Sequence, residues 1–162
     1  MLLFIIFPYF KTKIGDDKQI LDLLFAFSPD TAYEVLNSYN DYEKTIYTQM
    51  ILIADYLYPI VYSIFLSFGI SINLRKILTP KSRLLKLNIL PIIPLISDFL
   101  ENSSILPMLH LLPHRINALA YLASTANTIK WISLSVCMLM IVFILFVRIF
   151  RIIKKRYGIS EV

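Results

Sequence analysis

Cysteine, glycine and charged residues are scarce in this sequence, and each shortage excludes a class of protein. Cys137 is the single cysteine among 162 residues, so the chain forms no intramolecular disulfide and no cysteine-based metal cluster. Its three glycines supply no loop for cradling a phosphate, and no segment matches a dinucleotide or P-loop fingerprint. Only 17% of the residues are charged whereas 57% are hydrophobic, which departs from soluble composition. The composition therefore predicts an integral membrane protein.

Long apolar segments fill most of the chain and predict an all-α transmembrane bundle of three to four spans in one domain, residues 1–162. A spanning helix needs about 20 apolar residues, and segments near 46–74, 87–112 and 116–147 meet this requirement. The apolar segment 1–14 is shorter, so we expect either a short anchor or an interfacial segment. Prolines interrupt the second span, whose helix we expect to be kinked or to begin and end among them: Pro91, Pro94, Pro107 and Pro113.

Residues 29–40 predict an amphipathic helix rather than a span. Ser28 supplies an N-cap and Pro29 a first-turn proline. One face is apolar and the other polar and acidic; the apolar face comprises Ala32, Val35, Leu36 and Tyr39. We expect this helix to lie on the membrane surface or to pack on the bundle.

Charge is distributed unevenly and predicts an orientation. Basic residues gather in the loop 75–86 and in the tail 148–162, which places both on the cytoplasmic side of a multi-pass protein. The acidic residues before the first strong span fall on the opposite side: Asp16, Asp17, Asp22, Asp30, Glu34, Asp41 and Glu43. The net charge of +5 thus reflects topology and contact with the lipid bilayer. No groove-reading or stacking element accompanies these charges, so nucleic acid is not expected as a partner.

Four charged residues interrupt the predicted spans: Asp55, Asp98, Glu101 and Lys130. Each costs about 2.5 to 3.5 kcal/mol in the middle of a membrane helix, so such residues usually face the interior of a bundle and pair with one another. Helical spacing adds polar neighbours to the same faces, namely Tyr58 and Tyr62 beside Asp55, Asn102 beside Asp98 and Glu101, and Asn127 beside Lys130. The sequence therefore predicts a centre of three carboxylates and one lysine.

This centre is the candidate ligand or proton site. If all four groups were ionised its charge would be minus two, so we expect at least one carboxylate to hold a proton. The carboxylates could then act as a proton relay, a cation site or an acid and base. The alternative is that Lys130 only neutralises Asp98 or Glu101 and the network specifies helix packing.

Metal, cofactor and hydroxyl chemistry have weaker support. His110 and His114 have the spacing of metal ligands on a helix, but Pro113 lies between them, and we expect interfacial histidines rather than a zinc site. No metal and no cofactor is predicted. Serines in the apolar segments lack a nucleophile elbow and an adjacent base, and such hydroxyls usually bond to backbone carbonyls.

The order of these motifs resembles that of a group of small, uncharacterised polytopic membrane proteins. The resemblance covers Ser28 to Trp131 and is carried by Ser28-Pro29-x-x-Ala32-Tyr33, Asp55-x-x-Tyr58-Pro59-x-x-Tyr62, Asp98-x-x-Glu101-Asn102 and Lys130-Trp131. It implies that these positions form one constellation, and it implies no activity, substrate or cofactor. Those proteins have a fuller first membrane helix than the segment 1–14 provides.

Two classes of function remain from the sequence. The first is a membrane protein that binds or moves a lipid, another small molecule or a proton. Whether it is also an enzyme stays open; Asp98 or Glu101 would then be the acid or base of a lipid-modifying reaction. The second is a structural or assembly subunit that docks on a membrane protein partner, in which the buried charges fix the fold.

Overall fold

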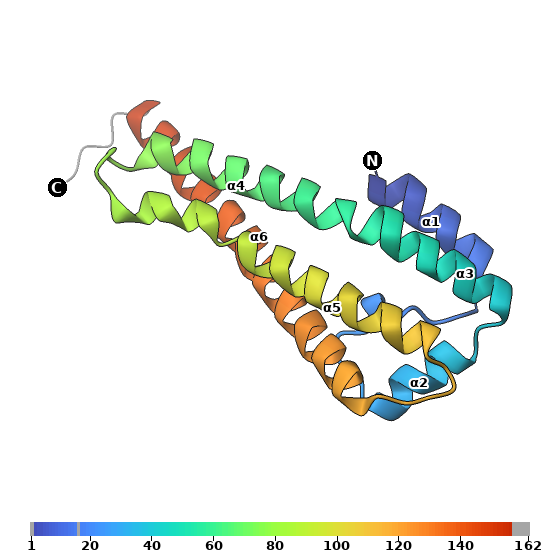
Figure 1. The fold of residues 1–162 in the computed structure, drawn as a ribbon. Coiled ribbons are helices and arrows are strands. Elements are labelled where there is room, and N and C mark those ends of the chain that lie inside the picture. Colours follow the sequence, from blue (N-terminus) through green and yellow to red (C-terminus); the bar gives the residue numbers. More distant parts are fainter. Residues whose placement is uncertain (1, 16, 157–162) are drawn as a thin grey trace.

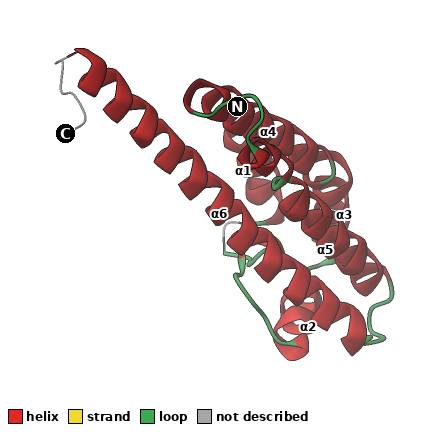
Figure 2. Cartoon of the chain, turned by 90° about the vertical axis from the view of Figure 1, so that its left-hand side faces the viewer, coloured by secondary structure: helices red, strands yellow, loops and turns green. Residues whose placement is uncertain are grey.

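The computed structural model describes residues 2–15 and 17–156, and these ranges are helical with no strand (Figure 1; Figure 2). The predicted all-α class is therefore confirmed. Met1, Asp16 and residues 157–162, which belong to the predicted apolar segment, acidic stretch and basic tail, lie outside the described residues. The elements are α1 (Leu2–Ile14), the 3-10 turn η1 (Leu21–Leu23), α2 (Pro29–Asn37), α3 (Asp41–Met50), the π turn η2 (Ile51–Asp55), α4 (Leu57–Ile77), the 3-10 turn η3 (Arg83–Ile89), α5 (Ile92–His110) and α6 (Asn117–Arg156).

One continuous helix runs through α3, η2 and α4 (Figure 1). It begins with a capping box, in which the Asn40 side chain accepts from the backbone N–H of Glu43 at 2.9 Å and Glu43 accepts from the N–H of Asn40 at 2.8 Å. The π turn is marked by the N–H of Tyr56 donating to the carbonyl of Ile51 at 3.1 Å. A π turn inserts an extra residue into a helix and re-aims the side chains around it, and it ends here at Asp55.

The amphipathic helix predicted at 29–40 is α2, which ends at Asn37. The Ser28 hydroxyl caps it by accepting from the backbone N–H of Thr31 at 3.1 Å. Its apolar face is buried in the same core as residues of α5 and α6, so the helix packs on the bundle. The predicted packing of this helix on the bundle is therefore confirmed.

The apolar segment near the N-terminus forms α1, which lies beside α3 (Figure 1). Phe10 and Ile14 are buried in the core that also contains Tyr47 and Met50 of α3. Gly15 ends the helix with a φ of +114°, and a Cβ there would lie 2.9 Å from Asp17 Oδ1. Glycine is therefore required where the chain turns away from α1.

Residues 17–28 form no long helix and contain η1. The Tyr39 hydroxyl holds this segment by donating to the carbonyl of Gln19. Burial raises the pKa of Tyr39, and nearby Glu43 raises it further, so this hydroxyl keeps its proton at physiological pH. The segment then leads through η1 to the N-terminus of α2.

The prolines delimit α5 much as the sequence predicts. The helix begins directly after Pro91 and ends before Pro113, with Pro107 tolerated in its last turns. Beside it, α6 continues without a break from Asn117 to Arg156. The predicted tail from residue 148 is thus helical as far as Arg156, and the helix extends beyond the predicted end at 147.

Two of the described helices are long and apolar enough to cross a membrane. They are Asp41–Ile77 and Asn117–Lys154, with mean hydropathies of 1.7 and 2.7. A core helix of a soluble protein would be largely buried, but only 39% and 11% of their most apolar stretches are covered by protein. Their exposed apolar surfaces therefore favour a membrane location.

Candidate functional site

Lys130 on α6 lies at the point where α5, α6 and η1 meet. Its Nζ is 2.6 Å from Glu101 Oε2 and 3.9 Å from Asp98 Oδ1, and it also pairs with the carboxylate of Asp22. The side chain is 5% exposed. Small buried residues before it on the same helix, Ala123 and Ala126, allow α5 to approach closely. The predicted pairing of Lys130 with Asp98 and Glu101 is present in the structure.

Asp22 is the member of this cluster that the sequence analysis missed. It lies on η1, and side chains of α6 hold the surrounding segment in place. Trp131 Nε1 donates to the carbonyl of Asp22 at 3.3 Å, and Asn127 Nδ2 donates to the carbonyls of Leu21, at 3.4 Å, and Leu24. Asp22 is the only acid in the apolar run Ile20 to Phe27, and this isolated charge could have identified it as a site residue.

Asn127 therefore has a different position from the one predicted. Its amide nitrogen bonds to the backbone of the η1 segment, and it does not line the cavity described below. Two further bonds reinforce this attachment. The N–H of Phe27 donates to Ser124 Oγ at 3.0 Å, and the Thr128 hydroxyl donates to the carbonyl of Phe25 at 3.1 Å. Hydrogen bonds from the polar face of α6 thus hold residues 21–27 against this helix and place Asp22 beside Lys130.

Asp98 links the cluster to α4. Its Oδ2 accepts from the Tyr62 hydroxyl at 3.2 Å, and its Oδ1 accepts from Asn102 Nδ2 at 3.1 Å. Asn102 Nδ2 also donates to the backbone carbonyl of Asp55 at 3.1 Å. The predicted residues Tyr62 and Asn102 are therefore brought together with Asp98, where they satisfy its carboxylate and join α5 to the π turn.

Asp55 differs from its predicted role. It makes no ion pair with Lys130, and the third carboxylate in contact with that lysine is Asp22. The side chain is 9% exposed, and within the described part of the chain its Oδ2 has no hydrogen-bond partner. The π turn ends here, so helical spacing alone misjudged the direction of this side chain. Asp55 instead faces a cavity.

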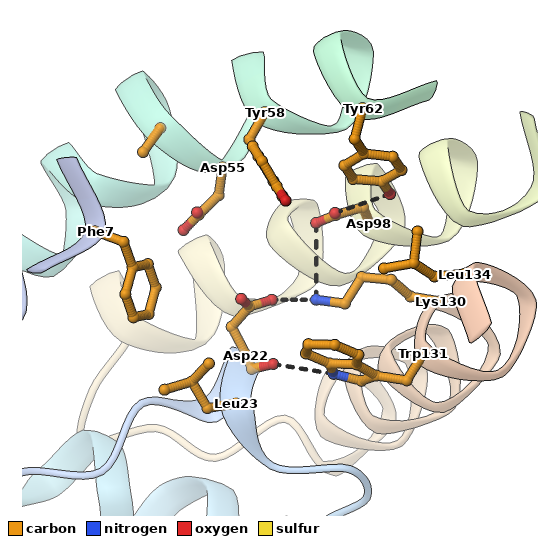
Figure 3. A pocket seen from close by; sticks show the side chains of 11 residues that line it. Phe7, Asp22, Leu23, Asp55, Tyr58, Tyr62, Asp98, Lys130, Trp131 and Leu134 are labelled. Carbon is orange, nitrogen blue, oxygen red and sulfur yellow. Dashed lines mark hydrogen bonds and ion pairs between the residues drawn. The ribbon is translucent and has the colours of Figure 1, made fainter. Parts of the chain in front are cut away.

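The cavity has a volume of about 230 Å³ and is lined by residues of α1, η1, η2, α4, α5 and α6 (Figure 3). Figure 3 shows the Asp55 carboxylate and the Tyr58 hydroxyl directed toward the same space as Asp22, Lys130 and Trp131. Charged groups and rings form one part of its wall, and aliphatic side chains close the rest. The lining residues are Phe7, Asp22, Leu23, Ala54, Asp55, Tyr58, Tyr62, Asp98, Lys130, Trp131 and Leu134.

Glu101 lies behind this cavity rather than in its wall. Its side chain is fully buried, and apart from the ion pair of Oε2 with Lys130, its oxygens have no hydrogen-bond partner among the described residues. A buried carboxylate without a second partner is costly unless a nearby charge compensates it. Lys130 is therefore the group that makes Glu101 tolerable in this position.

Among the described residues, the position that could hold a metal is the point where the carboxylates converge. Oxygens of Asp22, Asp98 and Glu101 lie within 4.8 Å of one another, a spacing compatible with ligands of a cation. The Lys130 ammonium lies among the same oxygens and supplies the positive charge itself. His110 is on α5 whereas His114 follows the end of that helix, and both are exposed, so the two do not share a helical face.

The arrangement therefore combines a lysine that pairs with three carboxylates and a fourth, unpaired carboxylate in a partly apolar cavity. No protein-family model matches the chain, and no curated protein or solved structure matches it either.

Proposed function

We propose that this is a multi-pass membrane protein that binds a small ligand in the cavity beside its charged centre. One observation carries the proposal: the carboxylate of Asp55 faces a cavity of about 230 Å³ without a hydrogen-bond partner for Oδ2 in the described part of the chain. A buried, unpaired polar group is costly, and a bound ligand would supply the missing partner. Convergent polar groups in an otherwise apolar cavity are typical of ligand sites.

The basic residues support an orientation and a depth for this site. Arg75 lies in the last turn of α4 and Arg148 lies in the second half of α6, and both belong to the predicted cytoplasmic side. At about 1.5 Å per residue, Asp55 lies about 30 Å from Arg75 and Lys130 about 27 Å from Arg148. The hydrocarbon core of a bilayer is about 30 Å thick. The site then falls at the opposite boundary of the membrane, where charges cost less than at its centre.

The second predicted span, 87–112, fits the same placement as an interrupted helix. It consists of η3 and α5, with the break at Pro91. Ser63 on α4 satisfies a carbonyl at this break, because its hydroxyl donates to the carbonyl of Pro91 at 2.9 Å. Interrupted helices are tolerated in membranes where neighbouring side chains bond to the freed backbone groups.

The contacts assign different roles to the charged residues. Lys130 pairs with both Glu101 and Asp98, which serves architecture and engages both acids within the protein. Asp55 is available to a ligand. This division favours binding over a lipid-modifying reaction, and it favours a ligand-binding protein over a structural subunit, for which an unpaired carboxylate in a cavity has no use.

The test is native mass spectrometry of the protein extracted gently from its own membrane, compared with an Ala54→Phe variant. Ala54 lines the cavity and is buried, so a phenyl ring there would occupy the ligand volume. We expect a defined small molecule to be released from the wild type and to be absent from the variant. Circular dichroism gives the helix content of both as the control for folding.

The same experiment has a contrary result. If wild type and Ala54→Phe release the same molecules, the cavity is not a binding site. If a stoichiometric partner chain is retained by both and no small molecule is found, the protein is an assembly subunit and the charged centre only stabilises its fold.

A further inference from the structure

We infer that the ligand of this cavity is an organic cation, an amine or quaternary ammonium group attached to an apolar body. The inference rests on the proposed function and adds the chemical class of the ligand. Three properties of the cavity carry it: its charge, its aromatic rings and the position of Asp55 outside the group of converging carboxylates.

The charge of the cavity wall favours a cation. Asp22, Asp55 and Asp98 line the cavity, and Lys130 is the single basic residue among the lining side chains. Lys130 is already engaged by Asp22, by Asp98 and, from behind, by Glu101. An anionic ligand would therefore meet excess negative charge, whereas a cation would compensate the carboxylate of Asp55, which has no ion-pair partner in the described residues.

Aromatic rings surround the same space. Tyr58 and Tyr62 contact each other edge to face with ring centroids 5.1 Å apart, and Phe7 and Trp131 line other parts of the wall. The Trp131 ring already makes a cation–π contact, since Lys130 Nζ lies 5.5 Å from its centroid. Rings grouped near a carboxylate are the usual recognition site for ammonium groups.

The remaining wall argues against a hydrated metal ion. Calcium takes six to eight oxygen ligands, but Asp55 is not among the carboxylates that converge, and Phe7, Leu23, Ala54 and Leu134 add apolar side chains to this wall. At about 30 Å³ per water molecule, the cavity has the volume of about eight waters. This suits an ammonium group with a short apolar portion. Leu23 is 51% exposed at the rim, where a longer chain could leave the cavity.

The same ammonium chemistry occurs in the headgroup of an amine-bearing lipid and in a free amine. The proposed depth at the membrane boundary allows either source. Native mass spectrometry separates them, because a phospholipid with an ethanolamine or choline head and a small metabolite differ in mass. In both cases the bound molecule must carry a cationic nitrogen.

Trp131 provides a direct reading of binding. It is the only tryptophan in the sequence and lines the cavity, so its fluorescence reports on this site. We would titrate the full-length protein in a neutral detergent with hexyltrimethylammonium chloride, and in parallel with 1-hexanol as the uncharged probe. The expected result is a saturable change in emission with the cation and at least tenfold weaker binding of the alcohol.

Three variants locate the interaction. Asp55→Asn removes the charge with nearly the same shape and should weaken cation binding at least tenfold. Tyr58→Leu, which removes a ring without changing any charge, should weaken it about threefold. Glu34→Gln is the matched control, because Glu34 is an exposed acid on α2 that does not line the cavity, and should leave binding unchanged.

The outcomes separate this inference from the proposed function. Equal binding of hexanol and the cation, or unchanged cation binding in both Asp55→Asn and Tyr58→Leu, would overturn the cationic class. So would the absence of any saturable change. If the wild type still releases a molecule that Ala54→Phe does not, the ligand site survives and only its chemical class is wrong; if there is no such difference, both proposals fail.

Discussion

The two halves of α6 use the same helix in opposite ways. Residues 117–137 bury small and polar side chains against the rest of the protein, including Ala123, Asn127 and Lys130. Residues 138–156 expose large apolar side chains, of which Phe143 and Phe146 are each 66% exposed. The first half belongs to the large core shared by α1, α2, α3 and α5, whereas the second contributes Ile144 to a small cluster with Ile70 and Leu74 of α4.

The difference shows which interactions define each half. In the first half, ion pairs and hydrogen bonds specify where α5 and η1 lie, and small residues let them approach. In the second half, exposed apolar side chains are suited to lipid chains, which require little precise fit. Substitutions should therefore have large effects in the first half and small effects on the exposed face of the second.

The largest effect is expected for Lys130→Met. It removes the only cation among Asp22, Asp98 and Glu101 and leaves buried carboxylates uncompensated, which should cost about 3 to 5 kcal/mol in the free energy of unfolding. The measurement is unfolding by denaturant in detergent, followed by circular dichroism. The double variant Lys130→Met with Glu101→Leu should recover part of the loss, because it removes the most buried of the acids. Wild-type stability of Lys130→Met would show that the ion pairs do not hold the fold.

Ala123→Leu should have the next largest effect. Ala123 is fully buried in the core that contains Ile105 and Met108 of α5, so a larger side chain must displace one of the helices. Overpacking of this kind costs about 1 to 3 kcal/mol. The matched control is Val142→Leu on the exposed face of the second half, which should leave the unfolding curve unchanged. Equal effects of the two substitutions would contradict the proposed division of α6.

The sequence predicted those parts of the structure that depend on position along a helix. The capped helix at Ser28, the burial of Lys130, and its pairing with Asp98 and Glu101 follow from periodicity and from the cost of buried charge. The pairing of Asp22 with Lys130 could not be predicted, because Asp22 lies in a connecting segment and no spacing rule relates two such distant positions. The direction of Asp55 did not follow either, because a π turn shifts the register of the helix at that residue.

The smallest effect is expected for Phe143→Ala, and it tests what covers the second half of α6. If lipid covers this face, the phenyl ring exchanges one apolar environment for another on folding, and its loss should change stability by no more than about 0.5 kcal/mol. The neighbouring Ile144 is buried against α4, so Ile144→Ala should cost at least about 2 kcal/mol. Both are measured by denaturant unfolding in detergent. A cost for Phe143→Ala as large as that for Ile144→Ala would mean that protein covers the phenyl ring, either a second copy of the chain or a partner, and would revive the assembly-subunit interpretation.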